Sequence, residues 1–379
     1  MNRKQSGDVL RKIINDVREK DYPYEKKPKE KINWTKYDIA QCKEMADMIN
    51  LIRDLVNSVK KHSPVEIIKN TKQVGRPPTS PYDIAKVLLL QSYLEAPNRV
   101  AEGLIYLFAE KLGLGSGFSY KTIERGYDKK IVDEILRKVF QLTNEPVKDL
   151  ETVFAPDGTG FPTSMKINYA NDRQRQNQNA QKSKKDPKFS DGDKEDDSWP
   201  KKTEKKRHDY VYALAMIGVK YKLYSSCVQN CDHSIGETSL FPEAIEQTAS
   251  NINNIEKVLG DGIYATRPIC NIVAKNNAKP YFLPRRNVRM KRKGSNTWID
   301  MLWDLLKNPQ KWLREYHMRS IAETGFSMIK RTSPEKIRKK LDPRKETETF
   351  LKFICHNIKR LCYLRYLADI EPISKTKSS

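Results

Sequence analysis

The sequence predicts a mixed α/β protein in which an all-helical domain precedes an α/β domain. Two changes of pattern along the 379 residues carry this prediction. Over residues 1–150, apolar side chains recur at steps of three and four, which is typical of amphipathic helices. From residue 151 the apolar runs become short and are bounded by Gly, Pro and Asn, which is typical of strands.

The N-terminal helical patterns are separated by clear breaks. A Gly-Arg-Pro-Pro run at 75–78 interrupts the chain, and Ser119 is a suitable N-terminal cap for a short helix. The segment 99–126 could read DNA as a helix-turn-helix through Lys121 and Arg125, although any helical hairpin has a similar pattern. The helices of this part are expected over 38–61, 82–95, 99–112 and 130–142.

Strands alternate with turns and helices from residue 151 onward. The first strand, 152–155, is expected to end at Pro156-Asp157-Gly158. The next two, 210–217 and 219–229, are expected to pair as a hairpin around Gly218. The remaining strands are expected over 258–261 and 280–284, and the remaining helices over 237–250, 297–306, 310–331 and 346–368.

These elements suggest three segments with one insertion. Residues 1–150 form the helical domain, for DNA binding or dimerisation, 151–335 form the α/β domain, and 336–379 form a basic helical extension. The stretch 171–207 holds 12 basic and 8 acidic residues and only two large apolar side chains. Because such a stretch cannot bury enough apolar surface, we expect it to be a disordered insertion.

The charge balance points to a polyanionic partner. Lys and Arg number 71 against 48 Asp and Glu, which gives a formal net charge of +23, and the last 99 residues carry +14 of it. No run approaches the roughly 18 to 20 apolar residues that a membrane span needs, and the first twenty residues have no signal-peptide pattern. We therefore expect no membrane association and a cytoplasmic protein associated with the nucleoid.

The six cysteines show no repeated Cys-x-x-Cys spacing. In a cytoplasmic protein they are expected to be reduced thiols. The closest approach to a metal motif is Cys227, Cys231 and His233, which lacks a fourth ligand at suitable spacing, so a zinc site is not favoured.

Acidic residues at strand ends are the candidates for chemistry. Asp157 and Asp261 each follow an apolar run and precede a glycine, which would let the backbone bend and aim the carboxylate at a ligand. Each Asp-Gly pair alone is more simply a turn. The helix over 310–331 adds four polar side chains that, at about 100° per residue, project from one arc of about 60°. These four are Tyr316, Arg319, Glu323 and Lys330.

The spacing Tyr-x2-Arg-x3-Glu-x6-Lys in that helix resembles the signature of DDE-type transposases of prokaryotic insertion sequences. Asp157, in APDGTG, and Asp261, in GDGIYATR, resemble the first and second aspartates of that family. The resemblance extends over about residues 151–335. The insertion 171–207 has no counterpart in it, and the large β-subdomain that some members insert after the second aspartate is absent.

The resemblance implies a ribonuclease-H-like core, which is a mixed sheet flanked by helices, with acids on the first strand, the fourth strand and a later helix. It implies Asp157, Asp261 and Glu323 as catalytic residues and metal ligands. Hard cations prefer oxygen ligands, so three carboxylates suit two Mg²⁺ ions, for which Mn²⁺ can substitute. Activated water would cut the transposon end, and the freed 3′-OH would attack target DNA.

Basic side chains near these acids are the expected DNA contacts. Arg319 and Lys330 share a helix face with Glu323 and can hold phosphates, while Tyr316 could stack on a base or bind a phosphate. A dense basic run follows the strand over 280–284 and is expected to track the DNA backbone, the alternative being a solvated loop. The expected DNA-binding residues are Tyr316, Arg319, Lys330, Arg285, Arg286, Lys121 and Arg125.

The resemblance also implies the partners. They are double-stranded DNA with terminal inverted repeats, target DNA and a second copy of the chain on DNA, since two ends must be cut in concert. Two alternatives stay open: a transposase-derived DNA-binding protein that has lost catalysis, and a metal-dependent nuclease without strand transfer. The intact set of three acids favours an enzyme over the first alternative, but the sequence does not separate the second from a transposase.

Overall fold

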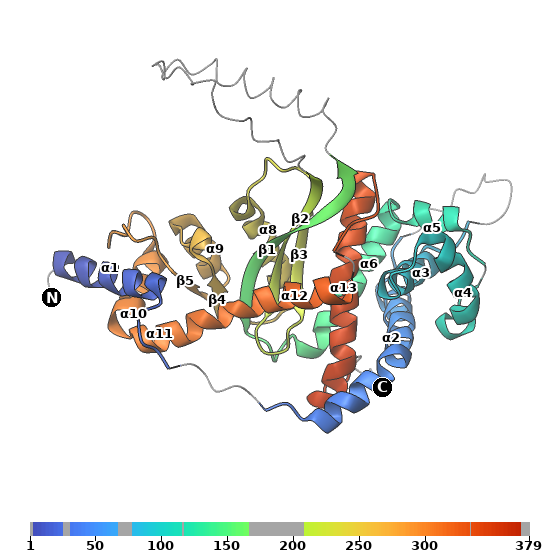
Figure 1. Ribbon diagram of the computed structural model, residues 1–379, viewed down its shortest axis with the longest axis horizontal. Helices are drawn as coiled ribbons and strands as arrows, with labels where there is room; N and C mark the ends of the chain where they lie inside the picture. Colours follow the sequence, from blue (N-terminus) through green and yellow to red (C-terminus); the bar gives the residue numbers. More distant parts are fainter. Residues whose placement is uncertain are drawn as a thin grey trace, which may run out of the picture.

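The computed structural model describes residues 3–25, 31–66, 78–115, 117–166, 208–333 and 335–372. The predicted insertion 171–207 lies outside the described residues. Figure 1 shows a central sheet with helices on both sides. The helices are α1 (Arg3–Glu19), α2 (Trp34–His62), α3 (Pro81–Tyr93), α4 (Asn98–Leu112), α5 (Tyr120–Gly126), α6 (Lys130–Asn144), α8 (Glu237–Asn251), α9 (Arg267–Lys275), α10 (Asn296–Lys307), α11 (Pro309–Tyr316), α12 (Ile321–Thr332) and α13 (Asp342–Leu367).

The sheet has five strands in the order β3-β2-β1-β4-β5. The β1–β2 and β2–β3 pairs are antiparallel, whereas β1–β4 and β4–β5 are parallel, so the sheet is mixed. The hairpin predicted around Gly218 is confirmed as β2–β3. The strands are β1 (Val153–Lys166), β2 (His208–Gly218), β3 (Tyr224–Asn230), β4 (Lys257–Gly260) and β5 (Lys279–Phe282).

Strand β1 is much longer than the sequence predicts. It was expected to end at Pro156-Asp157-Gly158, but its antiparallel pairing with β2 continues to Pro162. On its other edge, only Val153 and Phe154 pair with β4. The prediction of a strand end was wrong because the antiparallel partner extends the strand past the turn-like residues. Asp157 therefore lies within β1, where the edge toward β4 is no longer paired.

The two faces of the sheet bury two separate hydrophobic cores. Alternate residues of β1 and β2, such as Ala155 and Ala215, face α13 and the helices α2–α6. The residues between them, such as Phe154 and Leu214, face α8, α9 and α10. Both faces are thus covered by helices, which explains the near-continuous apolar run in β2.

Helix α13 lies between the sheet and the helices α2, α3 and α6 (Figure 1). Sixteen of its residues are buried, including the polar Asn357, which bonds to the backbone of Tyr224 on β3. The helix begins at Asp342, four residues before the predicted start. Its depth in the fold shows that this segment is part of the main hydrophobic core, since it contacts the helices and the sheet together.

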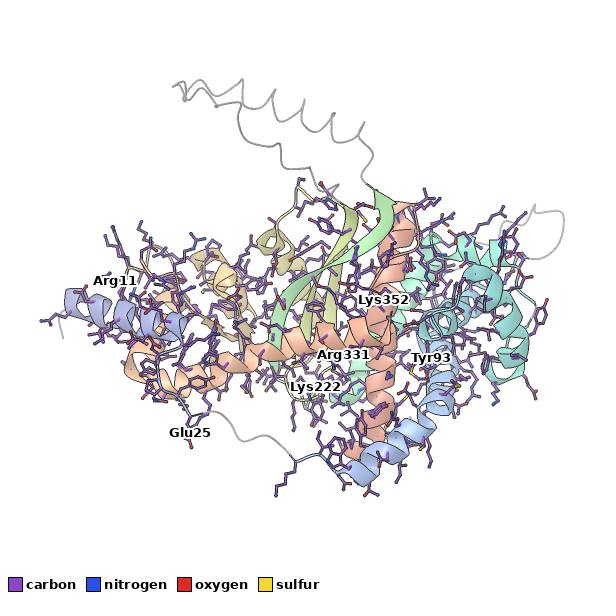
Figure 2. The ribbon with its side chains drawn as sticks, in the orientation of Figure 1. Arg11, Glu25, Tyr93, Lys222, Arg331 and Lys352 are labelled. Atoms are coloured by element: carbon purple, nitrogen blue, oxygen red, sulfur yellow. The ribbon has the colours of Figure 1, made fainter. Side chains whose placement is uncertain are left out.

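Helix α1 packs at the opposite end of the molecule, against α10. Its apolar residues Leu10 and Ile14 are fully buried in the core that includes α8 to α11. Arg11, labelled in Figure 2, donates to the Val288 carbonyl at 3.3 Å, and Arg18 donates to the Pro284 carbonyl at 2.9 Å. Helix α1 therefore fixes the loop that follows β5.

The single helix predicted over 310–331 is interrupted. It consists of α11, a 3₁₀ turn at His317–Ser320 and α12. A 3₁₀ turn advances about 120° per residue rather than about 100°, so the common arc calculated for a continuous helix does not hold across it. The helices predicted over 38–61, 82–95, 99–112, 130–142 and 237–250, and the Ser119 cap, are confirmed. None of the described helices is long and apolar enough to cross a membrane.

Candidate active site

Asp157 lies within β1, and Asp261 directly follows the neighbouring strand β4. Val153 of β1 pairs with Lys257 of β4, in parallel. Asp157 is four residues past Val153, and Asp261 is four residues past Lys257. If the register is extended, the two carboxylates lie at the same level of two adjacent strands, which run roughly 4.8 Å apart.

Each aspartate is oriented by the glycine that follows it. Asp157 Oδ1 accepts from the Gly158 amide at 2.9 Å, and Asp261 Oδ1 accepts from the Gly262 amide at 2.6 Å. Neither glycine has a positive φ, so the sequence-based argument from backbone bending was wrong. A Cβ on Gly158 would lie 1.8 Å from the Tyr212 hydroxyl, and one on Gly262 would lie 3.0 Å from the Leu283 carbonyl oxygen. The glycines are thus fixed by close packing.

Asp157 is surrounded by other negative charges. Burial raises its pKa, and although the Gly158 hydrogen bond opposes this, the nearby carboxylates of Glu237 and Glu323 raise it further, to about 6. Arg319 acts in the opposite direction but is the weakest of these influences. A carboxyl group with such a shift, held among other acids, is typical of a functional site.

Glu237 is a further acid beside Asp157, and the sequence had not singled it out. It lies in the first turn of α8, and its two carboxylate oxygens accept hydrogen bonds from Tyr212 on β2, at 2.7 Å, and from Tyr264 after β4. Burial raises the pKa of both tyrosines above the ordinary value, so they remain hydrogen-bond donors. An acid in the first turn of a helix also interacts favourably with the helix dipole, so its position in the sequence does not distinguish it from an ordinary helix-stabilising residue.

Arg319 connects Glu323 with Asp261. Its Nη1 lies 3.7 Å from Glu323 Oε1, and its guanidinium lies 5.3 Å from the centre of the Tyr316 ring. Burial lowers the pKa of Arg319, but the charges of Tyr316 and Asp261 outweigh this effect and raise it. Its Nε is buried and has no hydrogen-bond partner among the described residues. A phosphate oxygen would satisfy such a donor.

The four residues of the helix signature do not all point the same way. Tyr316 is 3% exposed and stacks on Trp312, so its ring supports Arg319 from inside the core. The Glu323 side chain is 67% exposed. Lys330, two turns further along α12, pairs with Glu335 at 2.7 Å. The structure therefore brings Tyr316, Arg319 and Glu323 together and places Lys330 apart from them.

The donor set has the chemistry that a magnesium site needs. The acids near Asp157 offer only carboxylate oxygens, which are the ligands that Mg²⁺ prefers. Among the described residues, however, no three His, Cys, Asp or Glu side chains stand at metal-ligating separations. Cys227, Cys231 and His233 likewise do not form a metal-ligating group among the described residues. The imidazole Nε2 of His233 lies 2.8 Å from the Tyr210 carbonyl oxygen.

The predicted basic contacts lie at two ends of the molecule. Arg285 and Arg286 are exposed in the loop after β5, where Arg286 pairs with Glu19 of α1 at 3.0 Å. Lys121 and Arg125 are exposed on α5, in the helical part. They lie beside a cavity but do not line it.

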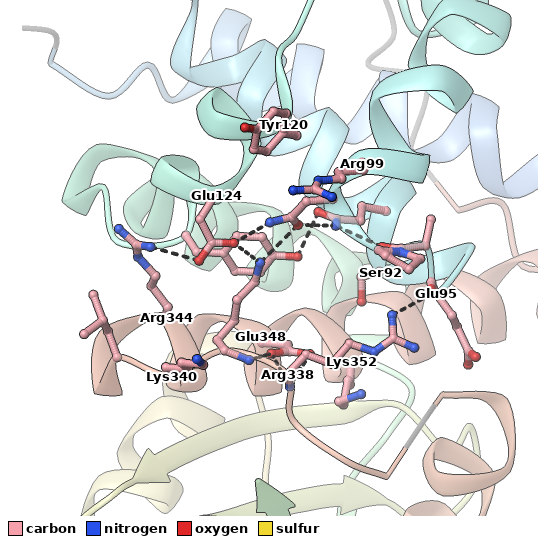
Figure 3. Close-up of a pocket in the computed structure, with 17 residues that line it drawn as sticks. Ser92, Glu95, Arg99, Tyr120, Glu124, Arg338, Lys340, Arg344, Glu348 and Lys352 are labelled. Carbon is pink, nitrogen blue, oxygen red and sulfur yellow. Dashed lines mark hydrogen bonds and ion pairs between the residues drawn. The ribbon is translucent and has the colours of Figure 1, made fainter. Parts of the chain in front are cut away.

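This cavity, of about 620 Å³, lies between α3, α4, α5 and the start of α13 (Figure 3). Glu124 on its wall pairs with Lys339 and, at 2.9 Å, with Arg344, which also pairs with Asp128 at 2.7 Å. We call these four residues the charged joint. Because each charge there faces an opposite one, the joint connects α5 to α13 and needs no ligand for charge balance.

No model of a known protein family matches the chain. The chain is similar to a protein of Archaeoglobus fulgidus named probable transposase for insertion sequence element ISA1214. The two are 25% identical over 354 residues, which cover 93% of each chain. The similarity extends over both the helical part and the part that carries the candidate site.

Proposed function

We propose that this chain is a DDE-type transposase of an insertion sequence, with a ribonuclease-H-like core. The observation that carries the proposal is the placement of Asp157 in β1 and of Asp261 directly after the adjacent parallel strand β4, with Glu323 of α12 close enough to raise the pKa of Asp157. The strand order β3-β2-β1-β4-β5 and the similarity to a probable transposase over 93% of the chain support it.

In this proposal, Asp157, Asp261 and Glu323 hold two Mg²⁺ ions, for which Mn²⁺ can substitute. Divalent ions bound to carboxylates supply an activated water and stabilise the charge on a phosphate that undergoes transfer. Water attacks a phosphodiester at the transposon end and leaves a 3′-OH and a 5′-phosphate. The 3′-OH then attacks a target phosphodiester, and the new bond forms as the target 3′-OH leaves.

The positions of the other side chains suggest their roles. The unpartnered Nε of Arg319 would donate to a non-bridging oxygen of the phosphate, and the buried Tyr316 ring would hold the guanidinium in place. Lys330, Arg285 and Arg286 would contact the DNA backbone further away. The partners are double-stranded DNA with terminal inverted repeats, target DNA and a second copy of the chain, with Lys121 and Arg125 of α5 as further DNA contacts.

The test is magnesium-dependent cleavage of DNA that carries the sequence flanking the gene. We expect the full chain to cut at one position, to leave a 3′-OH and to join that end to a second DNA molecule. Asp261→Asn should lower cleavage by about 100-fold or more and leave DNA binding intact, because it removes a ligand to the ions. Asp300→Asn, which changes an exposed aspartate of α10, is the matched control and should cleave normally.

The other outcomes separate the alternatives. Cleavage without end joining would indicate a nuclease. Salt-sensitive binding without cleavage by wild type would indicate a DNA-binding protein that has lost catalysis. Normal cleavage by Asp261→Asn would overturn the assignment of the acids.

A further inference from the structure

A second pocket, of about 260 Å³, lies where α9 begins beside the loop that follows β5. We call it the basic pocket. Five of its lining residues are cationic, and they come from two segments of the chain. The residues that line the basic pocket are Ala265, Arg267, Arg285, Asn287, Val288, Arg289, Lys291, Lys293 and Trp298.

The cations of the basic pocket have no acidic partners. Among the described residues, no carboxylate lines the pocket, and no ion pair is formed by Arg285, Arg289, Lys291 or Lys293. Arg267 donates only to the carbonyls of Lys291 and Arg292, each at 3.0 Å. Five like charges around so small a volume repel one another, so the arrangement favours binding of an anion.

The backbone of the basic pocket is held in place. Val288 and Met290 are buried, and Arg11 and Arg18 of α1 bond to the Val288 and Pro284 carbonyls. Lys293 has a positive φ of 44°, which a lysine adopts only where the surrounding structure holds it. The loop is therefore fixed in this shape, and the exposed cations are presented from a rigid backbone.

Trp298 provides a second observation that points to a ligand. Its side chain is 5% exposed, it lines the basic pocket, and its ring lies 5.1 Å from the Arg267 guanidinium. The indole Nε1 is buried and has no acceptor among the described residues. An oxyanion in the pocket would supply an acceptor for this donor.

The basic pocket is a direct continuation of the candidate active site. Asp261 caps the 3₁₀ turn Gly262–Tyr264, and the next residue, Ala265, lines the pocket. At about 2 Å per residue, the four residues from Asp261 to Ala265 span roughly 8 Å. Consecutive phosphates of one strand are farther apart than the rise of about 3.4 Å per nucleotide along the helix axis, so this span corresponds to roughly one or two nucleotides.

We propose that the basic pocket binds a backbone phosphate of DNA one or two nucleotides from the phosphate that is cut. The position of the cut in this inference rests on the proposed function. The binding of a phosphate by the basic pocket is independent of it. The cations that line the pocket suit the charge of a phosphodiester. The pocket thereby positions the strand beside the acids.

The first experiment measures DNA affinity of the full chain in EDTA over a range of KCl concentrations. Arg285→Gln/Arg289→Gln should weaken binding roughly tenfold and lower the slope of log K against log [KCl] by about two, as expected for two lost phosphate contacts. Lys275→Gln/Lys311→Gln, which removes two exposed charges from the same part of the chain, is the matched control and should lower the slope by much less. Equal slopes in the two variants would overturn the proposal.

The second experiment locates the phosphate. Methylphosphonates, which are uncharged, replace single phosphates along the flanking DNA. Wild type should lose affinity when a phosphate one or two nucleotides from the cut is replaced, and Arg285→Gln/Arg289→Gln should be insensitive to that replacement. Sensitivity of both proteins at that position would overturn the assignment.

Two further outcomes separate the sources of the phosphate and the two proposals. Calorimetry with inorganic phosphate or a free nucleotide should show no binding in the micromolar range. Tight binding of inorganic phosphate or a nucleotide that Arg285→Gln/Arg289→Gln abolishes would identify a site for a free phosphate compound, provided that the variant binds DNA with the same slope of log K against log [KCl] as wild type. That outcome would overturn the proposal. If wild type does not cleave DNA but the salt-dependence slopes of the two variants differ, the proposed catalytic function is wrong and the proposed phosphate site is supported.

Discussion

The charged joint and the candidate active site use charge in opposite ways. At the joint, Glu124 faces Lys339 and Arg344, and every charge has an opposite partner (Figure 3). Around Asp157, acids face acids, and in the basic pocket cations face cations. Paired charges stabilise the contact between two segments, whereas like charges held together destabilise the folded chain until a ligand of opposite charge binds.

The pKa values of two carboxyl groups express this difference. Burial acts to raise the pKa of Glu124, but the hydrogen bonds from Lys339, Asn98 and Arg344 outweigh it, and the pKa lies below the ordinary value. Burial also raises the pKa of Asp157, and there the nearby acids add to the effect. Burial therefore acts alike on both groups, and the neighbouring charges decide whether the pKa of the carboxyl group is lowered or raised.

The largest effect on stability is expected at the joint. Glu124→Gln leaves the Lys339 side chain, which is 8% exposed, without a charged partner. Removing one partner of a buried pair costs about 3–5 kcal/mol, and because the Glu124 side chain is 32% exposed we expect about 2 kcal/mol. Urea unfolding checks this value. Glu110→Gln, an exposed glutamate of α4, is the control, and an equal loss in the two variants would contradict the role of the joint.

Asp157→Asn should increase the free energy of unfolding, whereas Glu124→Gln should decrease it. The pKa of Asp157 is raised to about 6 in the folded protein, so ionisation costs the fold stability as the pH rises from about 4 to above 6. Removing the charge should stabilise the metal-free protein by about 1–2 kcal/mol at neutral pH, and the gain should vanish toward pH 4. Thermal unfolding at several pH values in EDTA checks this. A pH-independent difference would show that the pKa of Asp157 is not raised in the folded protein.

Sequence reasoning succeeded where the signal is local. Asp157 and Asp261 were found because each follows an apolar run, and the β2–β3 hairpin was found from the run that breaks at Gly218. The register that places Asp157 of β1 and Asp261 after β4 at corresponding positions is set by β1–β4 pairing, between residues about a hundred positions apart. No local pattern contains this register, so it could be expected only through the family resemblance.

The errors have the same physical origin. The length of β1 depends on its pairing with β2, a partner distant in sequence. Glu237 is set apart only by its hydrogen bonds with Tyr212 of β2 and Tyr264 of the turn after β4, and alone it is an ordinary first-turn acid. The basic pocket was visible only as a charged run, because its cavity requires Arg267 and Trp298 from outside the loop.

The smallest effects on the free energy of unfolding should come from two matched arginine substitutions, one in the charged joint and one in the basic pocket. Arg344→Gln removes a partner from both Glu124 and Asp128, and since its side chain is 19% exposed we expect a loss of about 1 kcal/mol. Arg289→Gln removes a cation that repels its neighbours, so stability should stay within about 0.5 kcal/mol of wild type and rise slightly at low salt. Urea unfolding at low and high KCl measures both. The comparison fails if Arg289→Gln destabilises the chain as much as Arg344→Gln does, because the cations of the basic pocket would then be held by acids of the fold and would not be free for a phosphate.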